Sequence, residues 1–418
     1  MTQSMSKPVV VIGGGISGIT VALEAAETGT QVTLVEKEPY LGGRVVRMHQ
    51  YFPKLCSPLC GMEINFRRIK SNPDVRVITN AEVQSVSGAK GDFSLKISVK
   101  PEFINDNCTA CGKCVEVCPV ERKNDFNYSM DNTKAVYMAH PMAYPSRYVI
   151  DGDVCKGSEC GECVKVCEYD AIDLNGKGKT LDVKAEKIVY ATGWKPYDAA
   201  KITTLGFGSV KNVVSNVMME RIAAVNGPTG GRIIRPSDGK EAKNIIFVQC
   251  AGSRDENHLP YCSSVCCLAT LKQTTYVREA YPDSQVTIFY IDIRSPGKYE
   301  TFYAKVAADK NVTLIKGKVA KIVEDSETGD VIVTAEDVHG GKKIEQRADM
   351  VVLATGMEPT ASGNGLNGPA VLDDSGFMPP TLQQDGIFSA GVAKMPFDVS
   401  TCLQDATGTA IYTLKGTS

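Results

Sequence analysis

Residues 7–18 read KPVVVIGGGISG, and this short stretch decides the fold of the N-terminal part of the chain. Residues 7–12 form an apolar run of the kind found in buried parallel strands. The spacing Gly13-x-Gly15-x-x-Gly18 then provides a tight turn, close approach of the backbone to a pyrophosphate, and close packing of the next helix on the strand. The stretch therefore predicts a strand–turn–helix unit that binds a dinucleotide.

The segment that follows completes this unit and indicates which dinucleotide it binds. The next predicted strand, QVTLVE, ends on Glu36, where a carboxylate can accept hydrogen bonds from ribose hydroxyls. The sequence EPYLGGR comes directly after it. Its Gly42, Gly43 and Arg44 resemble the second phosphate-contacting turn of the glutathione-reductase-like flavoproteins. This resemblance favours FAD over NAD.

The same resemblance continues in the second half of the chain. KIVYATGWKP (187–196) and DMVVLATGMEP (349–359) look like the two Ala-Thr-Gly strands at the domain crossings of that fold. GIFSAGVA (386–393) looks like its C-terminal flavin segment, although Val392 stands where the family usually has an acid. The candidate cofactor-binding residues are Gly13, Gly15, Ser17, Gly18, Glu36, Lys37, Gly43, Arg44, Thr192, Gly193, Thr355, Gly356 and Gly391.

Two cysteine runs in the middle of the chain predict iron–sulfur clusters. NCTACGKCVEVCPV contains Cys108-x2-Cys111-x2-Cys114-x3-Cys118-Pro, the bacterial ferredoxin pattern, in which the fourth cysteine ligates the other cluster. The second run, VCKGSECGECVKVCEYDAI, has two extra residues in its first gap and Glu168 in place of proline, but keeps four cysteines. A pair of zinc knuckles is the alternative.

Crossed ligation assigns these eight cysteines to two [4Fe–4S] clusters. One set is Cys108, Cys111, Cys114 and Cys167, and the other is Cys155, Cys160, Cys163 and Cys118. The run lies between the first nucleotide-binding half and the strand predicted at 187–192. We therefore expect a ferredoxin-like insertion in the flavin domain, within electron-tunnelling reach of the flavin.

A second strand–turn–helix–strand unit follows, but its turn lacks the glycine motif. The turn reads CAGSRDENHLPYC and keeps only Gly252, so a pyrophosphate cannot approach the helix closely. We predict that NAD(P)H does not bind here. Cys250 ends the strand, and Cys262, Cys266 and Cys267 are expected at the helix start, with the first two on one face. These thiolates could hold a third [4Fe–4S] cluster; small buried thiols are the alternative.

Two further features have open roles. Lys272 lies five residues after Cys267 and is the candidate catalytic residue, because it could reach the electron-rich edge of the flavin. The alternative is a lysine that faces solvent. The segment KLCSPLC places Cys56 and Cys60 after the flavin-binding half, either as a redox or ligand pair near the flavin or as structural thiols.

Composition narrows the class of protein. Of the 418 residues, 43% are apolar and 22% charged, and a net charge of −2 gives no argument for a nucleic-acid partner. Neither a secretory signal nor an apolar run of membrane-spanning length is present, so we expect a cytoplasmic protein. Fifteen cysteines in that compartment predict metal or redox chemistry rather than a disulfide framework.

The flavin motifs, the two-cluster run and VQCAGSRD…YCSSVCC together resemble the A subunit of heterodisulfide reductase over almost the whole chain. The resemblance implies that flavin and clusters relay or bifurcate electrons, and that Cys250, Cys262, Cys266 and Cys267 ligate a cluster beside the FAD. It implies a glutathione/thioredoxin-reductase-like α/β fold with two Rossmann domains and a two-cluster ferredoxin insertion.

The stretch YFPKLCSPLCGMEINFRRIKSNPDVRV is similar to one branch, the A subunit of the quinone-interacting membrane-bound oxidoreductase complex of sulfate reducers. That branch implies attachment to the inner membrane through two partners: a quinone-reactive membrane subunit, and a second subunit of the heterodisulfide reductase A type. Electrons would pass between the menaquinone pool and adenylylsulfate reductase. The alternatives are an electron-bifurcating heterodisulfide reductase subunit, a stand-alone NAD(P)H-dependent disulfide or polysulfide reductase, and an assembly scaffold with structural clusters.

The motifs also predict the domain organisation. The expected domains are a discontinuous FAD domain (1–100, 181–205 and 346–418), the ferredoxin-like insertion (101–180), and a vestigial pyridine-nucleotide-like domain (206–345) that carries the third cysteine set. Within that last domain, residues 311–325 and 331–338 are expected to form strands of an antiparallel meander.

Overall fold

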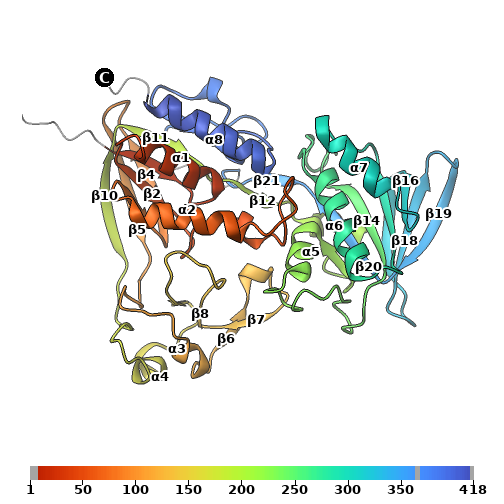
Figure 1. The fold of residues 1–418 in the computed structure, drawn as a ribbon, viewed down its shortest axis with the longest axis horizontal. Coiled ribbons are helices and arrows are strands. Elements are labelled where there is room, and N and C mark those ends of the chain that lie inside the picture. The colour runs from red at the N-terminus through yellow and green to blue at the C-terminus, as the bar shows by residue number, and fades with distance from the viewer. Residues whose placement is uncertain (1–7, 363–367, 415–418) are drawn as a thin grey trace, which may run out of the picture.

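The computed structural model describes residues 8–362 and 368–414, and its framework is a pair of parallel sheets (Figure 1). The first sheet draws its strands from three separate parts of the chain. In spatial order they are β22 (Ile387–Ser389), β11 (Lys187–Tyr190), β1 (Val9–Ile12), β2 (Val32–Val35) and β3 (Val75–Ile78). Lys7, expected to begin the first strand, lies outside the described residues.

Helices cover one face of this sheet. They are α1 (Ile16–Ala26), α2 (Leu59–Ser71) and α8 (Val399–Leu414), all near the first sheet in Figure 1. Alternate strand residues such as Val9 and Val11 pack with Leu23 of α1 and Phe66 of α2 in one apolar core. Because α1 begins directly after the glycine turn, this packing fixes the direction in which the turn presents its backbone N–H groups.

An antiparallel sheet covers the other face of the first sheet. Its strands are β10 (Lys179–Ala185), β5 (Phe93–Val99) and β4 (Ala81–Ser87). Phe93, Leu95 and Ile97 alternate with less buried residues along β5 and face the strands of the first sheet. Val99 lies opposite Lys179, so the chain leaves this sheet and rejoins it at a single point.

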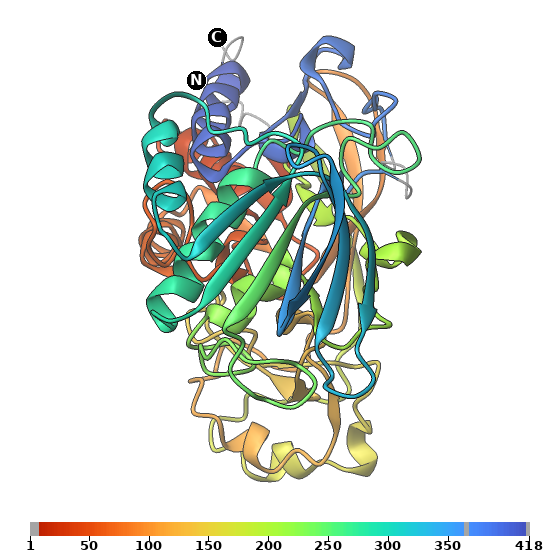
Figure 2. The ribbon, with the colours of Figure 1, turned by 90° about the vertical axis from the view of Figure 1, so that its right-hand side faces the viewer.

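The segment between those two residues is the cysteine-rich insertion, which forms the lower end of the molecule in Figures 1 and 2. It has little regular structure. Its elements are α3 (Lys113–Glu116), β6 (Glu121–Lys123), η2 (Asp125–Asn127), β7 (Asn132–Lys134), β8 (Val136–Tyr137), β9 (Val149–Ile150), η3 (Gly157–Glu159) and α4 (Glu162–Lys165). Cysteine side chains form a large part of its small apolar core.

The second parallel sheet faces the viewer in Figure 2. Its strands are β13 (Val213–Ser215), β20 (Met350–Thr355), β14 (Asn244–Ala251), β15 (Gln285–Tyr290) and β16 (Val312–Lys316). The helices on one face are α5 (Asn216–Ala223), α6 (Cys266–Ala280) and α7 (Glu300–Ala307). The strands against the other face are β17 (Val319–Glu324), β18 (Val331–Asp337) and β19 (Lys342–Ala348).

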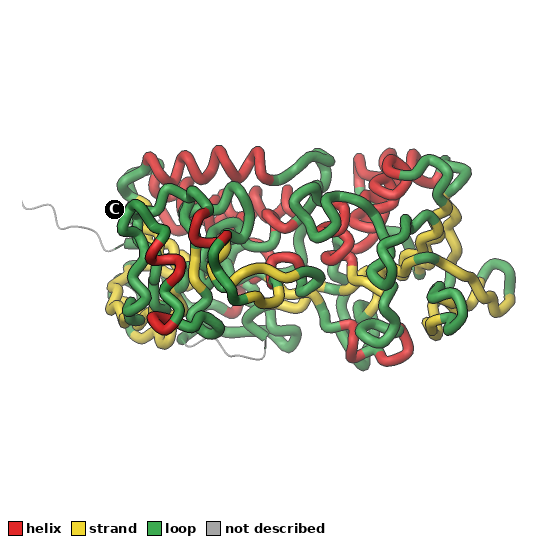
Figure 3. The backbone as a smooth tube through the Cα atoms, turned by 90° about the horizontal axis from the view of Figure 1, so that it is seen from below, coloured by secondary structure: helices red, strands yellow, loops and turns green. Residues whose placement is uncertain are grey.

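Two short crossing strands join the halves. β12 (Trp194–Pro196) pairs antiparallel with β21 (Met357–Pro359). Seen from below, the long helices of both halves lie along one edge of the molecule (Figure 3). No helix in the described ranges is both long enough and apolar enough to span a bilayer.

Two strands lie elsewhere than the sequence predicted. β20 pairs with β13 and β14 in the second sheet, whereas the boundary at 346 placed it in the FAD domain. β16 pairs parallel with β15, whereas an antiparallel meander was expected there. β20 is buried along its whole length, and a buried apolar strand does not indicate which neighbour it pairs with.

Candidate cofactor and cluster sites

The first glycine turn leaves no room for a side chain at Gly13 or Gly18. A Cβ on Gly13 would lie 2.3 Å from the Ala191 carbonyl oxygen, and one on Gly18 would lie 1.8 Å from the carbonyl oxygen of Gly13. Gly13 also has a φ of +111°, a conformation that L-residues rarely adopt. Helix α1 therefore starts in direct contact with the ends of β1 and β11, as a pyrophosphate-binding turn requires.

The second turn lies against the first. The Gly42 N–H donates to the Gly14 carbonyl oxygen at 2.8 Å, and a Cβ on Gly43 would lie 2.9 Å from the Cα of Gly15. Glu36 is buried at this place, and its Oε2 accepts the Gly14 N–H at 2.6 Å. Burial raises the pKa of the Glu36 carboxyl. The predicted ribose acceptor and the two glycine turns thus form one site.

The other candidate FAD residues surround these turns. The Thr192 hydroxyl is buried without a hydrogen-bond partner, next to Ala191. Arg44 donates to the Trp194 carbonyl oxygen and lies 5.1 Å from the centre of its ring, while Lys37 is exposed. Glycine-only turns and an unpartnered hydroxyl fit a dinucleotide with a pyrophosphate.

Gly391 approaches the start of α1 from the C-terminal segment. A Cβ there would lie 2.0 Å from Ser17 Oγ, and its N–H donates to Asp405 Oδ2 at 2.8 Å. Asp405, on α8, thus brings a carboxylate to the segment in which Val392 replaced the expected acid. No sequence pattern pointed to Asp405, because it lies 14 positions away on a helix.

Thr355 and Gly356, expected among the FAD residues, lie beside the third cysteine set, and their contact with FAD stays a prediction. The Cys266 thiol donates to the Thr355 carbonyl oxygen at 3.6 Å. A Cβ on Gly356 would lie 2.2 Å from Ser253 Oγ. The crossing strands connect this site to the first: the Thr360 N–H donates to the Gly193 carbonyl oxygen at 3.1 Å.

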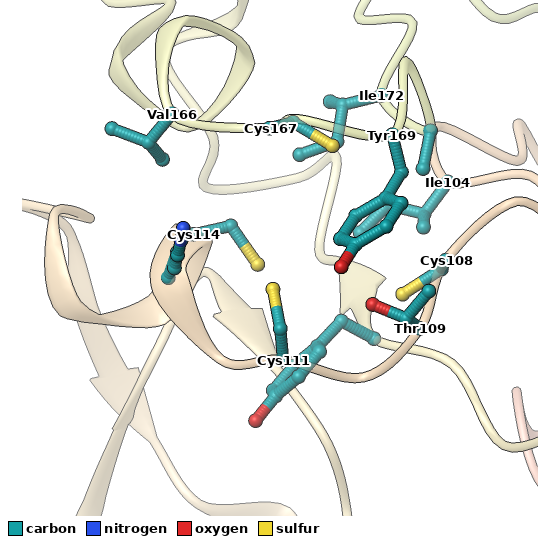
Figure 4. A pocket seen from close by; sticks show the side chains of 12 residues that line it. Ile104, Cys108, Thr109, Cys111, Cys114, Val166, Cys167, Tyr169 and Ile172 are labelled. Atoms are coloured by element: carbon teal, nitrogen blue, oxygen red, sulfur yellow. The ribbon is translucent and has the colours of Figure 1, made fainter.

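In the insertion, one pocket collects cysteines from both runs. They are the first three cysteines of the first run and the last cysteine of the second run: Cys108, Cys111, Cys114 and Cys167. Figure 4 shows their sulfur atoms around a common space, with the Tyr169 ring between Cys167 and Cys108. This is the set that crossed ligation predicts for one cluster.

Three cysteines of the other set, Cys118, Cys155 and Cys163, belong to or pack on the small apolar core of the insertion. Cys118 and Cys163 are each 8% exposed, and Cys155 and Cys160 are half-buried. Burial, and next the Cys155 thiol, raise the pKa of Cys163, and Cys118 acts in the same direction. Within the described residues, no three Cys, His, Asp or Glu side chains are grouped for a single metal ion. A [4Fe–4S] cubane does not need such a group, because each of its four thiolate ligands binds a different iron atom.

The third cysteine set gathers where β14 ends and α6 begins. Cys250 lies at the end of the strand with a φ of +56°, and Cys266 and Cys267 open the helix. Cys262 precedes the helix by four residues, so the expected position on the same helical face as Cys266 is wrong. Burial, and then Cys250, Cys267 and Cys262, raise the pKa of Cys266, so the other three thiols lie within electrostatic range of it.

One backbone turn recurs at all three cysteine sets. The sulfurs of Cys108, Cys155 and Cys262 each accept the N–H of the residue two positions later, at 3.5, 3.4 and 3.3 Å. Each donor residue has a φ near +60°; the donors are Ala110, Gly157 and Ser264. Hydrogen bonds to the sulfurs are one of the factors that set cluster potentials. The sequence did not reveal this turn, because the three donors share no residue type.

Lys272 is buried rather than solvent-facing. Its Nζ donates to the Gln50 carbonyl oxygen at 2.6 Å and pairs with Glu220 at 2.8 Å. Glu220 also accepts hydrogen bonds from Gln273 and Tyr276. The lysine therefore joins the segment after the second glycine turn to the second sheet. Its catalytic role remains a prediction.

The three remaining cysteines belong to none of these sets. Cys56 and Cys60 are exposed, on the loop before α2 and on its first turn. Cys402 is buried on α8, 3.5 Å from where a Cβ on Gly391 would lie. The structure assigns no partner cysteine to any of them within the described residues.

Comparison with known proteins supports an FAD-binding segment and a 4Fe–4S motif. A family model described as FAD dependent oxidoreductase matches residues 8–90, and one described as 4Fe-4S binding domain matches residues 101–121. Among solved structures, thioredoxin reductase of T. acidophilum has a TM-score of 0.51 at 14% identity, covering 97% of this chain and 96% of that one. Bacillithiol disulfide reductase of Bacillus cereus gives 0.52 at 15%, covering 97% and 98%. The thioredoxin-reductase-like fold is thereby confirmed.

Curated relatives match over nearly the whole chain. The iron–sulfur A subunits of CoB–CoM heterodisulfide reductase from Methanopyrus kandleri and Methanocaldococcus jannaschii are each 38% identical, over 96% and 97% of this chain. The A subunit of the H2:CoB–CoM heterodisulfide, ferredoxin reductase of Methanothermobacter thermautotrophicus is 36% identical over 97%. The chain spans 63–64% of the length of these relatives. The chain is thus similar to the A subunits of heterodisulfide reductase, and it carries FAD and 4Fe–4S binding motifs.

Proposed function

We propose that this chain is an electron-transfer subunit in which FAD exchanges electrons with two [4Fe–4S] clusters in the insertion and a third beside the flavin. The pocket shared by Cys108, Cys111, Cys114 and Cys167 carries the proposal, because a two-cluster ferredoxin needs this crossed set. FAD supplies two-electron chemistry and the clusters supply one-electron steps. The chain's own residues bind, orient and hydrogen-bond these groups.

Two observations support the third cluster. The N–H···S turn at Cys262 matches the turns at Cys108 and Cys155, which are the first cysteines of the two ferredoxin runs. A small apolar cluster also joins the two sites, because Ile16 at the start of α1 and Val265 before α6 both pack on it. A cluster at Cys250, Cys262, Cys266 and Cys267 would therefore lie beside the FAD turns.

The finer assignment concerns the electron partners. The names of the relatives support a heterodisulfide-reductase type of subunit, including the electron-bifurcating form, working with other subunits of a complex. The narrower proposal is a protein that relays electrons between the menaquinone pool and adenylylsulfate reductase, attached to the membrane through its partners. Anaerobic co-purification from the native source separates the two. Recovery of a quinone-reactive membrane subunit supports the narrower proposal, and its absence beside heterodisulfide-reducing subunits contradicts it.

Anaerobic reduction tests the proposed chemistry itself. Dithionite should bleach the flavin and produce the electron paramagnetic resonance signals of reduced [4Fe–4S] clusters, whereas NADPH or NADH alone should leave the flavin oxidised. Rapid bleaching by NADPH would instead support a stand-alone disulfide reductase. Clusters that show no redox change with dithionite or with reduced flavin would support a scaffold.

A further inference from the structure

A buried arginine joins three parts of the molecule. Arg221 lies on α5 of the second sheet and is 1% exposed. Its Nε donates to Asn127 Oδ1 in the insertion at 2.8 Å, and its Nη1 donates to the carbonyl oxygen of Arg47, after the second glycine turn, at 3.3 Å. The guanidinium also lies 4.7 Å from the centre of the Phe126 ring. One side chain thus contacts the insertion and the FAD-binding segment together.

Arg47 approaches the same ring from the FAD-binding segment. Its Nη2 donates to the Tyr40 hydroxyl at 2.8 Å, and its Nη1 donates to the Asp125 carbonyl oxygen at 3.1 Å. Its guanidinium lies 5.4 Å from the centre of Phe126 and 5.6 Å from that of Tyr128. The η2 turn of the insertion is therefore held between Arg47, from the FAD-binding segment, and Arg221, from helix α5 of the second half.

These two charges lack the counter-ions that buried arginines usually have. In the described part of the chain, no carboxylate oxygen lies within 4 Å of either guanidinium. Arg235, also buried, pairs instead with Asp330 at 2.9 Å and Asp238 at 3.3 Å. Burial lowers the pKa of Arg221 to about 10. Asp131 and Glu220 act against this shift without pairing directly with Arg221. Burial also acts to lower the pKa of Arg47, but Tyr40, Tyr128 and Glu38 outweigh it, so that pKa is raised. A buried cation stabilises negative charge that is placed near it.

We propose that the arginine junction, defined as Tyr40, Arg47, Phe126, Tyr128 and Arg221, positions the cluster-bearing insertion against both halves of the molecule and places positive charge between the insertion and the FAD-binding segment. The inference rests on the proposed function. In the step concerned, the one electron that the flavin loses is the one that a cluster gains, and no bond forms or breaks at the junction. The residues of the junction are positioning residues, since they act through the geometry and charge around the cofactors.

Substitutions of Arg221 in the anaerobic holoprotein test the junction. Arg221→Met keeps an apolar stem over Phe126 but removes the charge and the hydrogen bonds, whereas Arg221→Lys keeps the charge and loses the planar fork. Arg235→Met is the matched control, because it removes a buried arginine of the same half that contacts neither the insertion nor the FAD segment. Iron and flavin per chain are measured first, to select variants with wild-type content.

Three quantities are then measured: the midpoint potentials of the insertion's clusters, the flavin-to-cluster transfer rate after flash reduction, and amide hydrogen exchange of residues 121–140. In Arg221→Met we expect more negative potentials, a rate at least about tenfold lower, and faster exchange. Arg221→Lys should keep the potentials near wild type while the rate still falls. Arg235→Met should change none of the three.

The outcomes separate the two proposals. Wild-type protein without flavin or iron contradicts the proposed function. Wild-type potentials, rate and exchange in Arg221→Met contradict the junction alone, as do equal changes in Arg235→Met. If Arg221→Met does not fold, Arg221→Lys carries the test, and a wild-type transfer rate in that variant contradicts the junction.

Discussion

The cysteines of the insertion and those at the β14–α6 turn lie in opposite kinds of structure. The insertion's helices α3 and α4 have four residues each, and its small core is built partly from the cysteines themselves. The third set instead lies between a strand of eight residues and a helix of fifteen, at the edge of large apolar cores. In the insertion, the predicted cluster ligands also form part of the apolar core. The second sheet has an apolar core that does not include its cysteines. The insertion should therefore need its clusters in order to fold, whereas the second sheet should fold without a bound cluster.

Removing a buried ligand of the insertion should give the largest effect. Cys114→Ser is expected to remove one cluster, or about four iron atoms per chain, and much of the order of the insertion. Hydrogen exchange should then rise across α3, β6 and β9, while the first sheet keeps its protection. Unchanged protection of the insertion with the iron lost would show that its fold does not depend on the cluster.

The equivalent substitution in the third cysteine set should lower the iron content and leave the stability of the second sheet nearly unchanged. Cys266→Ser is expected to lower iron by about four atoms per chain, yet to change the free energy of unfolding of the second sheet by less than about 2 kcal/mol. Cys402→Ser is the control, since Cys402 is also buried but belongs to no set. It should leave iron unchanged. If Cys266→Ser also lost hydrogen-exchange protection in the second sheet, then both regions would depend on their clusters for folding, and the proposed difference between them would be wrong.

Much of this difference could be predicted from the sequence, because local spacing carries it. The turn from Gly13 to Gly18 needs glycines for reasons that act within a few residues, and the structure has the contacts that those reasons require. The cysteine spacing likewise predicted which residues of the two runs meet, including Cys167 with Cys108. Steric and ligand requirements that act over a few residues can be predicted from the sequence alone.

What the sequence could not predict depends on pairs far apart along the chain. Lys272 meets Glu220, and Arg221 meets Asn127, through tertiary packing that no local pattern encodes. Thr355 was assigned to the flavin because its Ala-Thr-Gly motif resembles the first one, yet β20 carries it to the cysteines. The repeated Ala-Thr-Gly motif predicts the local backbone conformation, but it does not predict which binding site the segment belongs to.

Acid should weaken the attachment of the insertion before the second sheet responds. His140 of the insertion is buried against Tyr40 and Phe126, and burial, followed by Arg221 and Arg47, lowers its pKa to about 4. The unfolded chain takes up a proton on this residue near pH 6.5, so stability falls as the pH drops towards 4. We expect a loss of about 2 kcal/mol between pH 7 and pH 5 from this group.

His140→Leu should remove that part of the pH dependence. Urea unfolding at pH 7 and pH 5, followed by hydrogen exchange in the insertion, measures the difference between variant and wild type. Equal loss of stability in both proteins would show that the imidazole is not the group responsible.

The smallest effect tests whether the three N–H···S turns are equivalent. The donor at Cys155 is Gly157, where an added Cβ would meet nothing within 4 Å, so Gly157→Ala should cost only the left-handed conformation, about 1 kcal/mol. Ala110→Gly and Ser264→Gly should each gain a few tenths of a kcal/mol. Thermal melts of the holoprotein check the signs. Opposite signs at Ala110 and Ser264 would mean that the turns differ.

Anaerobic quantification of iron, acid-labile sulfide and FAD in wild-type protein and Cys266→Ser tests the central claim most directly. Three [4Fe–4S] clusters predict about twelve iron atoms per FAD in the wild type and about eight in the variant. About eight iron atoms in both proteins would contradict the third cluster, and with it the proposal that the second sheet gained an iron–sulfur site where it lacks a nucleotide-binding turn.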